Sequence, residues 1–379
     1  MEKNKPPWKD ISFYVSKGQV NDIYYDAFTC EVPEQLLKKK GEITVFEEEH
    51  KWELAKKMAN PYEMVYTQEE KFPHPNICSL KPLSRSYFKM VEMLYAVDFY
   101  NDKKNKKYLR SAHIAEGPGG FMQAFIDVSE QHKREVKTMH AITLKSDTHY
   151  IPGWKKATNF LKRYAEIIRI CYGKDGSGDI YKKENQTYFI HAVSHKVDLF
   201  TADGGFDFSF DYSQQEKQIF PLLLCSFLVG FQVLGVNGTC IIKIFDTYSN
   251  STKTLLSLCG SCFKEYTLYK PATSRPCNSE RYFVGKNFKG NSKIVDILRT
   301  MYEQVMKDFY PSMYIEESEK EYINSISNTY EIQQMECIEL AKQFALNVDL
   351  FGQYYEKYYA KSREFCEEFR IPMKPKVLS

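Results

Sequence analysis

The run Glu116-Gly-Pro-Gly-Gly-Phe121 decides the fold predicted for this chain. An apolar stretch that reads as a strand, Tyr108–Ala115, comes directly before it, and a stretch that reads as a helix, Met122–Ser129, follows. Three glycines in a strand-to-helix turn let a bound ligand approach the backbone closely, because no Cβ atom stands in the way. The turn therefore predicts a site for a nucleotide-like cofactor at the carboxyl edge of a parallel sheet.

Strand-like and helix-like segments alternate around this turn. The candidate strands are Tyr108–Ala115, Met139–Leu144, Ile167–Cys171, Val197–Ala202, Thr239–Phe245, Glu265–Lys270 and Arg281–Gly285. The candidate helices between several of them are Met122–Glu130, Gly153–Tyr164 and Ile219–Leu234. Such alternation predicts a Rossmann-like, doubly wound α/β sheet. Only a loop with two prolines separates the last two strands, so we expect the last strand to run antiparallel, since a parallel crossover needs more chain.

Helical extensions are expected on both sides of the sheet domain, which we place at residues 81–290 and which opens with a helix at Ser84–Phe99. Residues 1–80 form an N-terminal extension with a loop and a helix at Glu47–Asn60. Residues 291–379 form a helical C-terminal extension. Its charged amphipathic segments, each predicted as a helix, are Ser292–Asp308, Ser318–Ser327, Tyr330–Asn347 and Leu350–Phe369. This tail either packs on the sheet domain or serves as a partner-binding arm, and both interpretations stay open.

The composition is that of an ordinary soluble globular protein, with 43% hydrophobic and 27% charged residues. The ten cysteines are scattered, which fits a reducing compartment. The one CxxC pair, Cys259 and Cys262, lacks a second pair or a histidine cluster nearby, so no metal site is expected. The start of the chain, Met1–Asp10, is polar and shows no signal peptide. The longest apolar stretch, Ile219–Leu234, is shorter than the roughly 20 residues of a membrane span. It predicts a buried helix, and no membrane is expected as a partner.

The net charge of +3 neither demands nor excludes nucleic acid, because a local basic patch can bind phosphates while acidic residues elsewhere hide it in the sum. The basic cluster formed by Lys103, Lys104, Lys106, Lys107 and Arg110 is such a candidate. A solvated loop is the interpretation that we favour for it. Aromatic residues make up 15% of the chain and could stack on bases, but packing in the core is favoured for most of them.

Four charged side chains are expected at the carboxyl edge of the sheet, where ligands of open α/β sheets bind. Asp203 follows a strand, Lys243 lies near the end of the next one, and Glu280 begins the last one. A lysine among apolar neighbours is costly to bury unless it is paired, and Asp203 is the expected partner because the two strands should be neighbours. Lys89 lies in the helix before the glycine turn.

These four residues resemble the Lys-Asp-Lys-Glu tetrad of the FtsJ-like (RrmJ-like) ribose 2′-O-methyltransferases. Ser84-Arg-Ser-Tyr-Phe-Lys89 resembles the family's Ser-Arg-x-x-x-Lys opening, and Glu116–Phe121 resembles its S-adenosylmethionine loop. Motifs similar to the mRNA cap branch, which occurs in eukaryotes and large DNA viruses, are Gly178-Asp-Ile180, Thr201-Ala-Asp-Gly-Gly205, Lys243-Ile-Phe245 and Lys270–Glu280. The resemblance covers about Asn60 to Asn287.

The resemblance implies methyl transfer from S-adenosylmethionine to a cap-proximal ribose 2′-hydroxyl, with the capped mRNA 5′ end as partner. The cofactor-binding residues that it implies are Glu116, Gly117, Pro118, Gly119, Gly120, Phe121, Asp179 and Asp203. Other capping or transcription proteins are expected to bind through the C-terminal helices. The expected location is the cytoplasm or virion for a viral enzyme and the nucleus for a cellular one.

The roles expected within the tetrad follow from the chemistry of the hydroxyl. A ribose 2′-hydroxyl is a poor nucleophile, and a lysine accepts its proton only if the lysine pKa falls well below about 10.4. Burial and a second ammonium lower that pKa, whereas Asp203 and Glu280 raise it. We expect Lys243 to accept the proton and Lys89 to stabilise the developing alkoxide, while the two carboxylates orient both amines.

One departure from the family pattern and two rival functions stay open. In many family members an acidic residue ends the strand before the glycines; here His113 stands at that place and Glu116 lies three residues later. Either side chain is a candidate for the methionine amino group. The rival functions are the same reaction on ribosomal or transfer RNA and a non-catalytic RNA-binding or assembly subunit that keeps the fold. A dinucleotide oxidoreductase is disfavoured because the glycine run does not fit G-x-G-x-x-G.

Overall fold

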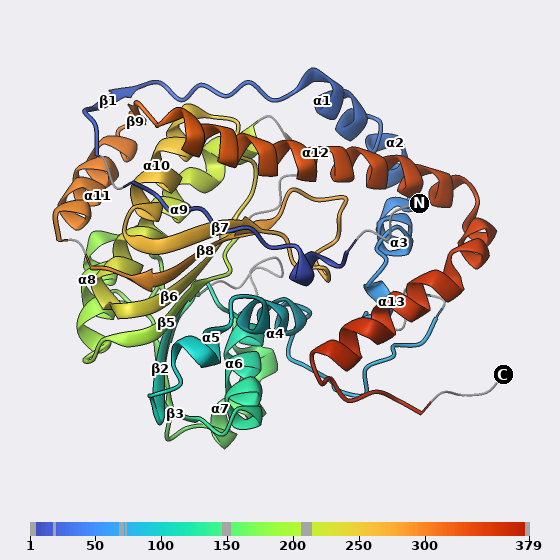
Figure 1. Ribbon diagram of the computed structural model, residues 1–379, viewed down its shortest axis with the longest axis horizontal. Coiled ribbons are helices and arrows are strands. Elements are labelled where there is room, and N and C mark those ends of the chain that lie inside the picture. The colour runs from blue at the N-terminus through green and yellow to red at the C-terminus, as the bar shows by residue number, and fades with distance from the viewer. Residues whose placement is uncertain are drawn as a thin grey trace.

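A sheet of seven strands with helices on both faces forms the centre of the protein (Figure 1). The computed structural model describes residues 5–17, 20–67, 72, 74–145, 153–205, 214–290 and 292–375. The strand order is β4-β3-β2-β5-β6-β8-β7. The strands are β2 (Tyr108–Ile114), β3 (Glu135–Ile142), β4 (Ile168–Cys171), β5 (Val197–Ala202), β6 (Leu234–Ile244), β7 (Phe263–Tyr269) and β8 (Arg281–Phe288). The predicted doubly wound α/β sheet is therefore confirmed.

The direction of β8 brings its first residues to the cofactor edge. Strands β2 to β6 pair in parallel, whereas β8 runs antiparallel between β6 and β7. Arg281 lies opposite Ile244, and Tyr282 lies opposite Lys243. The predicted antiparallel last strand is confirmed, and the residue before it, Glu280, lies beside the carboxyl end of β6.

Each face of the sheet carries its own hydrophobic core, because successive side chains of a strand point to opposite faces. On β6, Ile241 belongs to one core, and Cys240 and Ile242 belong to the other. The helices on the first face are α4 (Ser86–Ala96), α5 (Phe99–Asp102), α6 (Gly120–Gln131) and α7 (Thr158–Arg163). Those on the second face are α8 (Lys183–Ala192), α9 (Gln215–Val233), α10 (Asn250–Gly260) and α11 (Ser292–Val305). The sequence analysis missed α8 and α10.

Helix α9 is the buried apolar helix that the sequence predicts. Within the part of the chain that the structure describes, it alone is long and apolar enough to cross a membrane, by length and composition only. Core helices of soluble proteins pass the same test, and 72% of its apolar window is buried inside the protein. Its side chains, among them Phe220, Leu224 and Phe227, belong to the second core. The prediction of a buried helix is confirmed.

The N-terminal extension differs from its prediction. It contains α1 (Glu34–Gly41), α2 (Thr44–Glu48) and α3 (Trp52–Met58), with single turns of 3₁₀ helix at Pro7–Lys9 and Glu63–Val65. The prediction of a single helix at Glu47–Asn60 is wrong, because His50 adopts a left-handed φ of 57° and separates α2 from α3. A two-stranded sheet of β1 (Ile23–Asp26) and β9 (Tyr310–Met313), which sequence reasoning missed, joins this extension to the tail.

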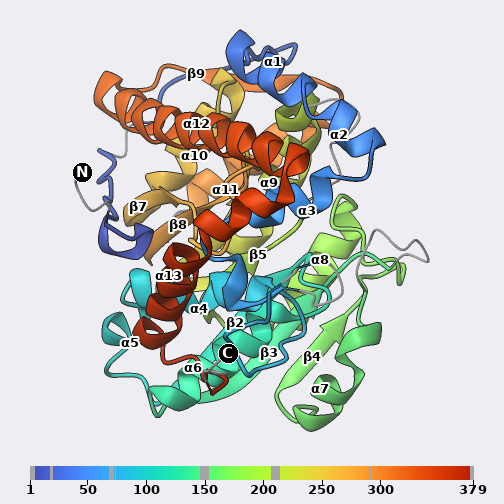
Figure 2. The same ribbon diagram turned by 90° about the vertical axis from the view of Figure 1, so that its right-hand side faces the viewer.

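The tail contains one long helix where two were predicted. Helix α12 (Glu317–Leu346) continues through Asn328 and Thr329, which are exposed and tolerated there because the opposite side of the helix is buried. A 3₁₀ segment at Val348–Gln353 and helix α13 (Tyr355–Glu368) follow. The two ribbon views show α12 crossing above the sheet edge and reaching α3 (Figures 1 and 2).

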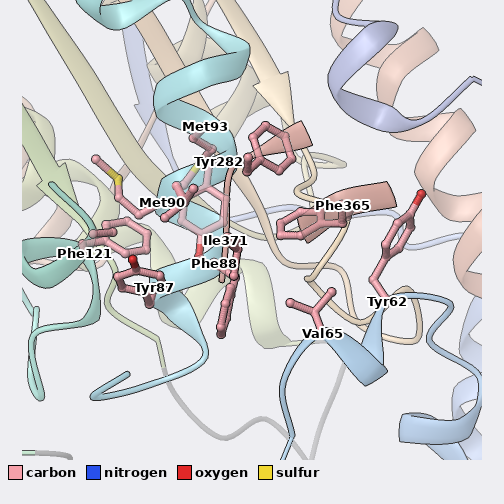
Figure 3. Close-up of a cluster of buried hydrophobic side chains, with 14 of the residues drawn as sticks. Tyr62, Val65, Tyr87, Phe88, Met90, Met93, Phe121, Tyr282, Phe365 and Ile371 are labelled. Carbon is pink, nitrogen blue, oxygen red and sulfur yellow. The ribbon is translucent and has the colours of Figure 1, made fainter. Parts of the chain in front are cut away.

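The first core is shared by all three predicted parts of the chain (Figure 3). Phe88 and Met90 of α4 lie at its centre, with Tyr62 from the N-terminal extension and Phe365 and Ile371 from the tail. The tail therefore packs on the sheet domain. The division into residues 1–80, 81–290 and 291–379 stays a prediction.

Candidate active site

Lys89, Asp203, Lys243 and Glu280 meet at the carboxyl edge of the sheet. Asp203 directly follows β5, Lys243 is the penultimate residue of β6, Glu280 directly precedes β8, and Lys89 lies in the first turn of α4. The Lys243 Nζ lies 2.8 Å from Asp203 Oδ1 and 3.3 Å from Glu280 Oε2. The Lys89 Nζ lies 2.5 Å from Glu280 Oε1. Glu280 therefore bridges the two ammonium groups, one with each oxygen.

The two lysines of this cluster have opposite pKa shifts. Burial lowers the pKa of Lys243, but the carboxylates of Asp203 and Glu280 outweigh it, so the pKa lies above its usual value. Burial also lowers the pKa of Lys89, and the charge of Lys243 lowers it further. The pKa of Lys89 therefore lies below its usual value despite the contact with Glu280. Although burial acts to raise the pKa of Glu280, the two lysines hold it well below its usual range. In the free protein, Lys89 is thus the amine that gives up its proton more readily.

Tyr282 and Ser274 complete the cluster, and the sequence analysis missed both. The Tyr282 hydroxyl donates to Asp203 Oδ1 over 2.8 Å. The Ser274 hydroxyl donates to Glu280 Oε1 over 2.8 Å. Tyr282 could have been found, because residues two apart in a strand share a face and Tyr282 is two residues after Glu280. Ser274 lies inside the Lys270–Glu280 motif, but nothing local to it indicated this contact.

The loop Pro271–Glu280, which we call the Glu280 loop, is closed by a buried lysine. The Lys270 Nζ donates to the Asn278 carbonyl over 2.8 Å, to Asn278 Oδ1 over 3.0 Å and to the Glu280 carbonyl over 2.8 Å. Burial lowers the pKa of Lys270 to about 7. Since three donors of one ammonium hold the end of the loop, the backbone of Glu280 has a defined position.

Helix α4 holds the start of the Glu280 loop through Glu92. This glutamate lies three residues after Lys89, on the same side of the helix, and is fully buried. It accepts hydrogen bonds from the Tyr269 hydroxyl and, over 2.9 Å, from the Ala272 N–H. Burial raises its pKa to about 8, despite these bonds. One face of α4 therefore contacts both ends of the loop, Ala272 through Glu92 and Glu280 through Lys89.

The N-terminal extension contributes a second buried carboxylate, Glu63, which has no exposed surface. Its Oε1 lies 2.8 Å from the Arg275 Nη2 of the Glu280 loop, and its Oε2 lies 3.1 Å from the Arg85 Nη2 beside the start of α4. Asn60 also donates to Oε2 over 2.8 Å. Burial acts to raise the pKa of Glu63, but the two guanidinium groups lower it to about 2. Glu63 therefore ties the two segments that carry Lys89 and Glu280 to each other.

The glycine turn favours glycine at two of its positions, one for its backbone conformation and one for lack of space. Gly119 has a φ of 106°, a conformation that favours glycine, and directly precedes α6. A Cβ atom on Gly120 would lie 2.2 Å from the hydroxyl oxygens of Ser84 and Ser86. Gly117 donates its N–H to Thr143 Oγ1 over 3.4 Å, and Pro118 follows through a cis peptide bond.

Phe121, the last residue of the turn, has its side chain in the first core, and its predicted contact with the cofactor stays a prediction. It is fully buried, and its ring centroid lies 5.9 Å from that of Tyr282 (Figure 3). Its N–H donates to Glu116 Oε1 over 2.8 Å. Phe121 therefore supports the turn from the core.

Glu116 and His113, the two candidates left open for the methionine amino group, differ in their free hydrogen-bonding capacity. Glu116 Oε1 accepts the first N–H groups of α6, whereas Oε2 has no hydrogen-bond partner among the residues that the structure describes. Burial and the charge of Asp203 raise the pKa of Glu116 well above its usual value. Both ring nitrogens of His113 are bonded over 2.7 Å, to Thr201 and Ser111 hydroxyls, and burial lowers its pKa to about 3. Only Glu116 has an unused polar atom.

Asp179 lies at the same sheet edge, in a loop against the end of β3. A Cβ atom on Gly178 would lie 1.9 Å from the Thr143 carbonyl oxygen, so only glycine allows this approach. The Asp179 Oδ1 accepts the Tyr181 N–H over 2.9 Å, which holds the side chain in a local turn. Because Thr143 also contacts Gly117, the Asp179 loop and the glycine turn share one neighbour.

The basic cluster near Lys103 lies away from the tetrad, around the amino end of β2. Lys103 donates to the Asn237 carbonyl, and Lys106 pairs with Asp198. Both contacts are made within the protein at the edge of the sheet opposite Asp203 and Lys243. Across the described ranges, no group of three or more His, Cys, Asp or Glu side chains is arranged to hold a metal ion.

Comparisons with known proteins identify the chain's relatives. A family model described as FtsJ-like methyltransferase matches residues 82–288, more than half of the chain. Cap-specific mRNA (nucleoside-2′-O-)-methyltransferase 1 of Xenopus laevis is 32% identical over a 255-residue alignment that covers 62% of this chain and 28% of that protein. The Homo sapiens protein of the same name is 31% identical over the same shares of both chains. Cap-specific mRNA (nucleoside-2′-O-)-methyltransferase 2 of Danio rerio is 27% identical over a 250-residue alignment that covers 61% of this chain and 31% of that protein.

The match spans less than a third of the length of these curated relatives. Among solved structures, a Plasmodium falciparum protein assigned as a ribosomal RNA methyltransferase matches with a TM-score of 0.39 and 19% identity. That match covers 55% of this chain and 99% of the other. The strand order and directions described above carry the fold assignment.

Proposed function

Because the chain belongs to the FtsJ-like methyltransferase family, we propose that it transfers a methyl group to the ribose 2′-hydroxyl of a cap-proximal nucleotide of mRNA. The observation that carries the proposal is the joined cluster of Lys89, Asp203, Lys243 and Glu280 at the carboxyl edge of the sheet. All four residues fall within the family-matched region. The names of the curated relatives support capped mRNA as the substrate class.

S-adenosylmethionine is the proposed methyl donor, which supplies a methyl group on a positively charged sulfur. The residues at the glycine turn fit such a group: Gly119 and Gly120 let the turn pack closely on the residues before α4, and the buried Glu116 Oε2 can receive a cationic amino group. Glu116 is preferred to His113 for this contact because both nitrogens of His113 are already used. Asp179 and Asp203, at the same edge, are the further proposed contacts.

Lys243 is the proposed proton acceptor, and its surroundings set a condition for that role. Asp203 and Glu280 raise the pKa of Lys243 in the free protein, because they stabilise its ammonium form. Lys243 can accept the hydroxyl proton only after this stabilisation is weakened and the ammonium has lost its own proton. A cation bound beside Asp203 acts in that direction, because it competes for the carboxylate and repels the ammonium. Lys89 stabilises the developing alkoxide, and Glu280 holds the two amines at a constant separation.

The test combines a matched RNA pair with a matched lysine pair. Capped and uncapped RNA of one sequence are incubated with S-adenosylmethionine, and mass spectrometry locates any added methyl group. Transfer to the capped RNA alone, at the first or second nucleotide, supports the proposal. Equal transfer to both RNAs favours ribosomal or transfer RNA as substrate. Absence of transfer together with absence of cofactor binding in calorimetry favours a non-catalytic subunit.

The lysine pair separates chemistry from folding. We expect Lys243→Ala to abolish transfer while cofactor affinity stays nearly unchanged, because the amine acts on the hydroxyl. Lys264→Ala, on an exposed position of β7, should leave both unchanged. Full activity of Lys243→Ala would remove this residue from the mechanism.

The place of action and the protein partners belong to the same proposal. A function inside the cell fits a substrate that is a capped mRNA, in the nucleus for a cellular enzyme and in the cytoplasm or virion for a viral one. Binding of other capping or transcription proteins by the C-terminal helices stays a prediction.

A further inference from the structure

One face of α12 lies along the Glu280 loop, although α12 is outside the family-matched region. This face consists of Ser327, Tyr330, Gln334 and Cys337, which we call the α12 stripe. Their spacing of three, four and three residues places them on one side of a helix. The stripe contacts the residue before the loop, a residue within it and the residue after it.

The stripe contacts the start and the middle of the loop through hydrogen bonds and a sulfur contact. The Lys270 N–H donates to the Tyr330 hydroxyl oxygen over 3.1 Å. The Gln334 Nε2 donates to the Cys277 carbonyl over 3.0 Å, and the Sγ atoms of Cys277 and Cys337 lie 2.8 Å apart. Gln334 is only 3% exposed, so this bond is shielded from water.

The stripe also contacts the first residue after the loop. The Arg281 Nη1 donates to the Ser327 hydroxyl over 3.2 Å, and its guanidinium lies 5.4 Å from the centre of the Tyr330 ring. Arg281 directly follows Glu280 and is 1% exposed. The residues on both sides of the loop, Lys270 through its backbone and Arg281 through its side chain, are thereby held against one helix.

We propose that α12 is a positioning element for methyl transfer, in which Tyr330 and Gln334 hold the Glu280 loop so that Glu280 keeps Lys89 and Lys243 in place. The inference rests on the proposed function for its catalytic part. The physical reason is the low tolerance of an in-line transfer for displacement: a misplacement of about 1 Å costs about 100-fold in rate. A loop carbonyl that loses its buried donor shifts to find another, and the carboxylate at the end of the loop moves with it.

The test uses two adjacent glutamines of α12. Gln334→Met removes the buried donor and nearly keeps the side-chain volume, whereas Gln333→Met makes the same change at an exposed position. We expect Gln334→Met to speed hydrogen–deuterium exchange in peptides covering residues 271–280 and to lower kcat by about tenfold to 100-fold. The affinity for S-adenosylmethionine should stay within about twofold, and Gln333→Met should leave exchange, kcat and affinity unchanged.

Two results would overturn the inference. The first is that loop exchange and kcat of Gln334→Met stay within about twofold of the wild-type values, and the second is that Gln334→Met and Gln333→Met change exchange and kcat equally. A loss of cofactor affinity as large as the loss of kcat would indicate general loosening and also contradict it. Where Gln334→Met fails to fold, Tyr330→Phe removes a single oxygen atom and is read in the same way.

The exchange measurement separates this inference from the proposed function, since it needs no turnover. If the wild-type protein fails to methylate capped RNA but the loop of Gln334→Met exchanges faster, the proposed function is rejected. The role of α12 in holding the loop then remains. An active protein whose loop exchanges equally in both variants rejects the role of α12 alone.

Discussion

Replacing Glu63 with glutamine tests whether the N-terminal extension stabilises the segments that carry the tetrad. The carboxylate is fully buried and contacts the guanidinium groups of Arg85 and Arg275 at 3.1 and 2.8 Å. Glu63→Gln keeps the size of the side chain and one acceptor, but removes the negative charge between two positive ones. Breaking a buried ion pair from one side is strongly destabilising, because the remaining charges stay without a partner.

The size of the effect follows from the pKa of Glu63. A decrease of the pKa from 4.5 to about 2 corresponds to about 3 kcal/mol, at about 1.4 kcal/mol for each pKa unit. Because the pKa is lower in the folded than in the unfolded protein, this stabilisation is complete above about pH 4.5 and is lost as the pH falls toward 2. We therefore expect Glu63→Gln to lower the free energy of unfolding by about 3 kcal/mol at pH 7, and by less at pH 3.

Urea denaturation of both proteins at pH 7, 5 and 3 measures these differences. The matched control is Glu53→Gln on α3, whose carboxylate is 67% exposed and pairs with Lys56. An exposed ion pair contributes about 0 to 1 kcal/mol, so the control should differ little from the unchanged protein. A change below about 1 kcal/mol for Glu63→Gln at pH 7, or a difference that does not shrink at pH 3, would refute the reasoning.

Three further predictions concern the turn, the loop and the cofactor. Burial raises the pKa of Glu116 well above its usual value, so binding of a cationic ligand beside it should release protons, and Glu116→Gln should abolish the release. Calorimetry in two buffers of different ionisation enthalpy measures the release, and equal binding enthalpies in both buffers for the wild-type protein would contradict the prediction. Gly120→Ala places a Cβ atom 2.2 Å from two serine hydroxyls and should lower the free energy of unfolding by about 1 to 3 kcal/mol in urea, whereas Gly153→Ala, with nothing within 4 Å, should not. Lys270 has a folded-state pKa of about 7, below its unfolded value, so the protein should gain stability as the pH rises from 7 toward 10; thermal denaturation at pH 7, 8 and 9 should show that Lys270→Met lacks this gain.

The sheet and its functional edge could be predicted because their signals are local. The bounds of β5 were predicted to the residue, and those of β2 to within one. Asp203 and Lys243 were expected to be neighbours because consecutive parallel strands usually pair. The antiparallel direction of β8 followed from a loop too short for a crossover, and that direction brought Glu280 to the same edge.

Two of the failures share one physical cause, which is stabilisation by distant parts of the chain. Helix α12 was predicted as two helices with a gap at Asn328 and Thr329. Both are weak helix formers, yet packing of the buried side of the helix overrides them. Strands β1 and β9 are four residues each and lie almost three hundred residues apart in sequence, so neither has a local signal strong enough to identify it.

By itself the sequence determined which side chains reach the carboxyl edge. The end of a strand and the direction of the next strand both depend on short local segments of sequence. Only the tertiary structure decided how those side chains are held. Glu63 meets Arg275 from 212 residues away, and Gln334 meets Cys277 from 57 residues away. Such contacts form when separate segments bury polar groups together. The partner of each buried polar group then depends on how all the segments pack together, because leaving such a group unpaired costs too much free energy.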